Sequence, residues 1–93
     1  MNITGYTVEK IIDPTGILEG DRYEFFINIE VDKDDELYSE RGVILRVIFA
    51  SMENTEKIVQ YQFIENETNE VLNFEMEEDE MKMITQFCKE HIE

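Results

Sequence analysis

A change in the spacing of apolar residues is the feature that most constrains the fold of this 93-residue chain. Over the first three quarters, apolar and polar residues alternate with a period of two, which is typical of half-buried β-strands. From about Glu77 onward, the apolar residues recur three or four positions apart, as they do on one face of an α-helix. The pattern therefore predicts an α+β protein in which the strands come first and a helix comes last.

The alternation predicts four or five strands joined by short connections. Connections this short favour antiparallel neighbours, because a parallel crossover needs a dozen or more residues. We expect one domain over residues 1–93, with an antiparallel meander over about residues 2–74 and one C-terminal helix over about residues 77–92 packed on one face. The expected strands are 2–11, 23–31, 42–50, 58–65 and 71–74, with turns at 13–16, 51–56 and 65–69 and an acidic loop at 32–41 anchored by Leu37 and Tyr38.

The same alternation assigns side chains to the two faces of the sheet. One face is predicted to carry a full apolar set: Phe25, Ile27, Val43, Leu45, Val47, Val59 and Phe63. The helix presents a single apolar stripe to cover it: Met81, Ile84, Phe87, Cys88 and Ile92. One stripe cannot cover both faces, so the other face is left open as a candidate contact surface, with the residues Phe26, Ile44, Arg46 and Ile48.

Arg46 has two interpretations at this stage. As a structural residue, it pairs across the strands with Glu24 or Glu30 while its stem covers apolar surface. As a functional residue, it is the centre of a contact patch, because arginine ringed by exposed apolar groups is the usual make-up of an interface hot spot.

The charge of the chain limits the partners it can have. Twenty-three acidic and eight basic residues give a net charge of −15. A field this negative repels nucleic acid and anionic membranes, so we expect neither as a partner. The chain shows no secretory leader and no apolar segment long enough to span a bilayer, and its one cysteine, Cys88, is compatible with a reducing compartment. We therefore expect a cytoplasmic protein.

No motif in the chain predicts catalysis, a cofactor or a metal site. The acidic loop Asp32–Glu36 fails the EF-hand spacing, because Leu37 and Val43 stand where that loop needs glycine and glutamate. Weak binding of a divalent cation by its carboxylates is left open. Cys88 and His91 are three positions apart on the helix, but zinc needs four ligands and the chain has no other cysteine or histidine.

Four stretches of the chain resemble a family of short acidic cytoplasmic proteins of uncharacterised function from Gram-positive, spore-forming bacteria. They are Gly5–Glu9, Asp13–Leu18, Gly20–Phe25 and Phe87–His91. The resemblance covers nearly the whole chain and implies a single bacterial domain. It implies no activity, cofactor or site residue.

The leading hypothesis for the function is a non-enzymatic interaction or regulatory module. Its partner is another protein, basic or otherwise, or a second copy in a homodimer. The first alternative is a nucleic-acid mimic that occupies a basic protein's binding site, which needs the acids to form one continuous stripe. Residues 65–93 carry ten of the acids and two bases, so acidic residues are denser in the C-terminal part of the chain. The second alternative is a small enzyme that uses a buried carboxylate with a raised pKa.

The first prediction is that the chain folds without a metal ion or a disulfide, because the strands and the helix stripe supply an ordinary small core. Thermal unfolding should have the same midpoint with and without a chelator and a reductant. Loss of folding on chelation would show that Cys88 and His91 are metal ligands.

Overall fold

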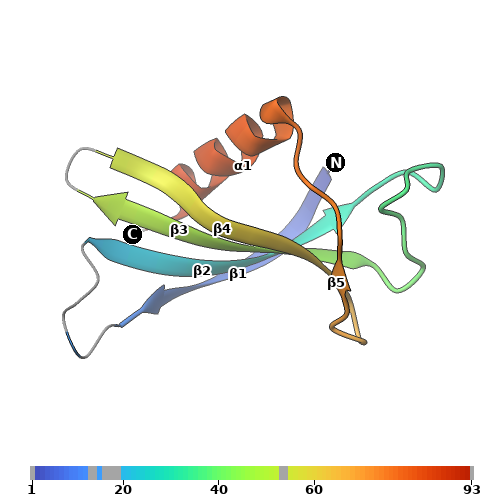
Figure 1. The fold of residues 1–93 in the computed structure, drawn as a ribbon, viewed down its shortest axis with the longest axis horizontal. Coiled ribbons are helices and arrows are strands. Elements are labelled where there is room, and N and C mark those ends of the chain that lie inside the picture. The colour runs from blue at the N-terminus through green and yellow to red at the C-terminus, as the bar shows by residue number, and fades with distance from the viewer. Residues whose placement is uncertain (1, 13–14, 16–19, 53–54, 93) are drawn as a thin grey trace.

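The computed structural model describes residues 2–12, 15, 20–52 and 55–92, and in these residues it shows five strands followed by one helix. The strands form one antiparallel sheet in the order β1-β2-β3-β4-β5, and α1 lies on one side of it (Figure 1). The predicted α+β meander with a C-terminal helix is confirmed. The elements are β1 (Asn2–Ile11), β2 (Asp21–Glu30), β3 (Val43–Met52), β4 (Thr55–Glu65), β5 (Val71–Leu72) and α1 (Glu78–His91).

The hydrophobic core lies between the sheet and α1. Every second residue of β2 and β3 is buried, among them Phe25 and Leu45, which are fully buried. From the helix, Ile84 and Cys88 are fully buried against this face, and the rest of the predicted stripe packs around them. Burying a large apolar side chain contributes about 1.5–3 kcal/mol, so this packing holds α1 on the sheet.

One residue assigned to the core face from the sequence was placed wrongly. Val59 is 39% exposed, and Ile58 packs against the core instead. The reason is a register shift: Phe49 pairs with Ile58, whereas Ile48 pairs with Gln60. The extra residue in β4 is a β-bulge, which moves the preceding side chains to the other face.

The turn predicted over residues 51–56 is shorter in the structure than expected. The ladder between β3 and β4 continues through Ser51 with Glu56 and Met52 with Thr55, so these residues belong to the strands.

Close by, Gly20 has φ +72°, and an added Cβ would lie 2.7 Å from the Ser51 carbonyl oxygen. Only glycine fits this entry into β2 without strain. The turn predicted over residues 13–16 lies outside the described residues except for Thr15.

The strand predicted over residues 71–74 is shorter than expected, because the chain leaves the sheet edge after Leu72. The Met76 N–H donates to the Tyr61 hydroxyl oxygen at 2.9 Å, which ties this connection back to β4. The helix then begins with a cap that the sequence did not reveal. The Glu80 carboxylate accepts a hydrogen bond of 3.0 Å from the Glu77 N–H, as in a capping box.

The acidic loop between β2 and β3 is anchored by Leu37, as expected. The Leu37 side chain is 9% exposed, but Tyr38, the second predicted anchor, is 38% exposed and lies at the surface. In the described part of the chain, no helix is long and apolar enough to cross a membrane.

The second prediction tests the docking of α1. Replacing the fully buried Ile84 with alanine should lower the free energy of unfolding by about 2–5 kcal/mol, because it removes buried apolar atoms and leaves a cavity in the core. The matched control, Met83→Ala, removes a side chain that is 41% exposed and should cost within about 0.5 kcal/mol. Denaturant unfolding measures both. Equal losses would mean that α1 does not pack through this stripe.

Candidate functional site

The face of the sheet opposite α1, which we call the open face, holds the four predicted contact residues. Phe26 pairs across the strands with Arg46, and Ile44 and Ile48 flank Arg46 on the same side of β3. Phe26 is 37% exposed, and the other three side chains are partly buried. Among the described residues no helix covers this face (Figure 1). The structure therefore brings the four residues together on one uncovered surface.

Arg46 forms an ion pair within this surface. One carboxylate oxygen of Glu24, Oε2, accepts from Arg46 Nη2 at 2.6 Å and from Arg46 Nε at 2.8 Å. The two side chains are about three-quarters buried, with 25% and 24% exposure. The cross-strand pairing expected of Arg46 is therefore observed, with Glu24 and not Glu30 as its partner. The ion pair also fixes the guanidinium at the centre of the open face.

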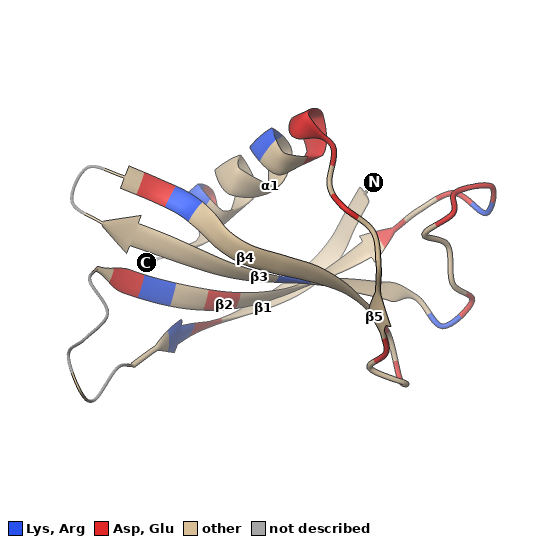
Figure 2. Ribbon diagram, viewed as in Figure 1, with Lys and Arg blue, Asp and Glu red and all other residues tan. Residues whose placement is uncertain are grey.

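Charge on the open face is balanced, in contrast to the rest of the molecule. The strand registers place six charged residues on this face. Three are basic and three are acidic, within a chain whose net charge is −15. Figure 2 shows basic and acidic positions next to each other near the left-hand ends of β2 and β4, whereas the start of α1 is acidic. The six residues are Arg22, Arg46, Lys57, Glu9, Glu24 and Glu30.

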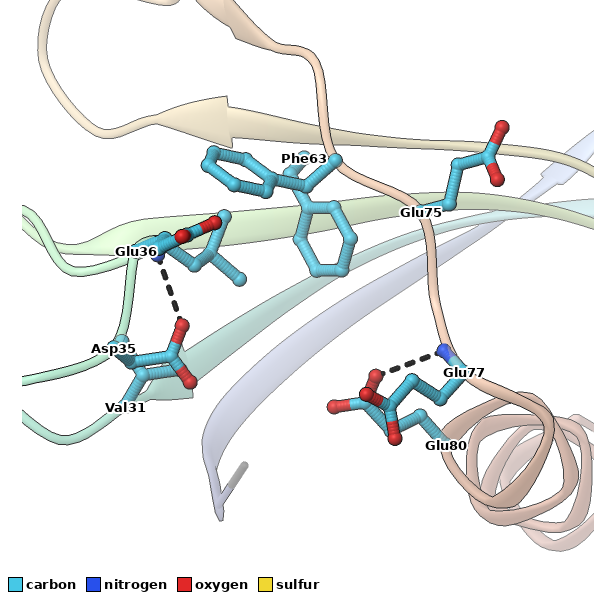
Figure 3. Close-up of a pocket in the computed structure, with 9 residues that line it drawn as sticks. Val31, Asp35, Glu36, Phe63, Glu75, Glu77 and Glu80 are labelled. Carbon is cyan, nitrogen blue, oxygen red and sulfur yellow. Dashed lines mark hydrogen bonds between the residues drawn. The ribbon is translucent and has the colours of Figure 1, made fainter.

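A second candidate site is a hollow of about 290 Å³ between the β2–β3 loop and the connection that precedes α1 (Figure 3). Its apolar wall includes Phe63 from β4 and Leu37 from the loop. Acidic side chains from these two segments and from the first turn of α1 line it: Asp35, Glu36, Glu75, Glu77 and Glu80.

Two carboxylates of the hollow have structural partners. Asp35 Oδ1 accepts from the Leu37 N–H at 2.9 Å, and Glu80 accepts from the Glu77 N–H. These bonds hold the loop and the helix start in shape. The described residues contain no cluster of three or more histidine, cysteine or carboxylate groups arranged to hold a metal ion. The hollow is an acidic surface feature that attracts cationic groups in general.

Cys88 and His91, the pair considered as metal ligands, have different surroundings. The Cys88 thiol is fully buried under the sheet, and burial raises its pKa to about 12. The His91 ring stacks on Phe87 at 4.1 Å and meets the Tyr6 ring edge-on at 4.8 Å. Its Nδ1–H donates to the Phe87 carbonyl oxygen at 2.6 Å. The pair therefore contributes to packing, and Tyr6 is a neighbour that sequence spacing did not reveal.

Glu65 is another residue that the sequence analysis missed, and it joins the loop before β3 to the turn after β4. Its carboxylate accepts hydrogen bonds from the hydroxyls of Ser39 and Thr68, each at 2.9 Å. These two bonds, helped by the nearby charge of Arg41, lower the Glu65 pKa. A lowered pKa means that these contacts stabilise the fold above the ordinary pKa of glutamate and are lost as pH falls through the lowered value. Among the described residues no charged side chain is fully buried, although those of Arg46 and Glu24 are about three-quarters buried.

The third prediction concerns the Cys88 thiol. Because this thiol is buried and has a raised pKa, it should not react with a thiol-specific disulfide reagent at about pH 8 in the native protein. It should react at the rate of a free thiol once denaturant unfolds the chain. The absorbance of the thiolate that the reagent releases on reaction gives both rates. Fast reaction without denaturant would mean that α1 is not docked at this position.

Comparison with known proteins gives a family but no function. Neither the curated proteins nor the solved structures include a match to this chain. A family described as a family of unknown function (DUF6509) matches residues 1–93. This result confirms the expected membership of a family whose function is not known. Because the match covers the whole chain, the chain belongs to the family of unknown function DUF6509.

Proposed function

We propose that this chain is a non-enzymatic interaction module and that the open face is the surface with which it binds another protein. One observation carries the proposal: the open face is uncovered by the helix and balanced in charge, in a chain with a net charge of −15. The centres of protein interfaces are depleted in net charge and enriched in aromatic residues and arginine. Phe26 and Arg46 supply these two residue types at the middle of the face.

The ion pair between Arg46 and Glu24 makes this face suitable for burial. A buried charge without a partner costs several kcal/mol, about 3–5 when one member of a buried pair is removed. Here the guanidinium and the carboxylate already neutralise each other before any partner arrives. A partner can then cover Phe26 and the isoleucines beside it without leaving either charge unpaired.

We place this module in the cytoplasm of a bacterium. The resemblance to acidic cytoplasmic proteins of spore-forming bacteria supports this setting. The chain has a single cysteine, which is compatible with a compartment where thiols stay reduced.

A second candidate function is the nucleic-acid mimic. It is favoured by the acids that line the hollow beside Leu37, which come from the β2–β3 loop and from residues 75–80 (Figure 3). Such a mimic would bind basic proteins with strong dependence on salt, because its carboxylates would replace phosphates. Binding through the open face would depend less on salt, because that face is balanced in charge.

The fourth prediction tests the open face in the native cells. A photo-crosslinking amino acid at position 26 should join the chain to a defined partner, and the same group at position 83 should not, because Met83 is exposed on the helix side of the molecule. Adding Arg46→Glu should abolish the crosslink from position 26, since it places two carboxylates side by side at the centre of the face.

Two controls make this result interpretable. The exchange Glu24→Arg with Arg46→Glu keeps the internal ion pair and reports on folding through circular dichroism and thermal unfolding. The variant Lys82→Glu makes the same charge change on the helix and should leave the crosslink intact. If Arg46→Glu folds and the crosslink from position 26 persists, the open face is not the binding surface.

A further inference from the structure

The open face carries unpaired charge of opposite sign at its two ends. Arg22 and Lys57 lie in one cross-strand row, on either side of Ala50, near the starts of β2 and β4. Glu30 lies at the other end of the face, opposite Asn2. Among the described residues, none of these three charged side chains forms an ion pair. In addition, Nε of Arg22 is buried and has no hydrogen-bond partner there.

Two of these charges, Arg22 and Glu30, are placed symmetrically about the centre of the face. Phe26 lies midway along β2 between Arg22 and Glu30, about 13 Å from each at the usual rise of a strand. Arg46, opposite Phe26, is already neutralised by Glu24. Glu9, the remaining charged residue of the face, lies opposite Glu24, between Phe26 and the end that carries Arg22 and Lys57. With Glu9 counted, that end has a net charge of +1 and the end with Glu30 has a net charge of −1.

A surface of this kind is complementary to itself under a two-fold rotation. When the axis crosses the strands at Phe26, between two stacked sheets, it brings Arg22 of each copy over Glu30 of the other. Two packed sheets cross at about 30°, which separates such positions sideways by about 7 Å, within the combined reach of the two side chains. A two-fold axis along the strands would instead set each of these residues over its own copy, which is repulsive.

We propose that the partner on the open face is a second copy of this chain, in a two-fold dimer whose sheets stack face to face with their β2 strands antiparallel. This inference rests on the proposed function, because it names the partner of the same surface. The face is large enough for the purpose: four strands of about ten residues have a footprint of about 600 Å². A standard interface buries about 800 Å² per partner, counted as accessible surface, which exceeds a flat footprint.

The charge of the whole chain also favours this geometry over other ways of pairing two copies. Two chains with a net charge of −15 repel each other over about 8–10 Å at physiological ionic strength. The repulsion between touching surfaces is least where each copy presents balanced charge. Stacking by the open faces also directs both copies of α1, with its acidic first turn, away from the interface.

The fifth prediction tests this dimer by sedimentation equilibrium of the full chain at physiological ionic strength. The unmodified chain should dimerise. Arg22→Glu alone and Glu30→Arg alone should each weaken dimerisation tenfold or more. The reason is that each variant sets like charges opposite each other at both contacts between positions 22 and 30 in the dimer. An equimolar mixture of the two variants should regain association, because each mixed pair restores opposite charges at both places.

Matched controls separate this contact from the effect of net charge. Lys89→Glu and Glu40→Arg make the same charge changes at exposed positions outside the open face and should leave dimerisation within about threefold of the unmodified chain. Circular dichroism confirms that each variant is folded. If Arg22→Glu or Glu30→Arg fails to fold, it is replaced by Arg22→Gln or Glu30→Gln at the same position. These variants remove the charge without reversing it, so they should weaken dimerisation less. The charge-reversal variant at the other position then tests the effect of opposing like charges.

Three results would overturn the dimer: an unmodified chain that stays monomeric at millimolar concentration, controls that weaken association as much as the test variants, or a mixture that fails to associate. The proposed function fails separately. If the chain is monomeric but the crosslinker at position 26 captures another protein in an Arg46-dependent way, the interaction surface stands and the second copy is not its partner. If neither occurs, both are wrong.

Discussion

The packing of one helix on one face of the sheet is the interaction on which the rest of this structure depends. The apolar stripe of α1, centred on Ile84 and Cys88, covers one face of the central strands. A chain of 93 residues has no second helix among its described elements to cover the other face. That face must therefore be compatible with water while keeping β-forming residues such as Ile44 and Ile48. The ion pair of Arg46 and Glu24, set between these isoleucines, supplies the polarity that an uncovered sheet needs.

Much of the fold could be predicted because periodicity reports burial directly. The alternation in β2 and the stripe of α1 were both predicted correctly, since the apolar residues there face the core, with Phe26 as the exception in β2. The position of Val59 could not be predicted, because a bulge adds one residue without any change in composition. The capping glutamates Glu77 and Glu80 were also missed, because none of the three residues before the helix is a serine, threonine, aspartate or asparagine.

The candidate site was predicted in part, for a similar reason. Phe26 and Arg46 could be placed on one face because neighbours across a short hairpin follow from strand register. The choice of Glu24 over Glu30 as the partner of Arg46 needed that register to the exact residue. The acidic hollow was out of reach of the sequence. Its walls come from the β2–β3 loop, from β4 and from the start of α1, and only the three-dimensional fold brings these segments together.

The two long outer strands of the sheet, β1 and β4, pair with their inner neighbours in an interrupted register. The β2–β3 ladder has an unbroken register, whereas the β1–β2 ladder shifts between Ile3 and Gly5 and the β3–β4 ladder shifts between Ile48 and Phe49. Because β5 pairs only with residues 63–64, most of β4 has an edge with no neighbouring strand among the described residues, as β1 has. An open strand edge is a template for pairing with other chains, and a bulge interrupts that template. The irregularities thus restrict chain-to-chain contact at the edges, so this sheet can remain open without growing into a larger one.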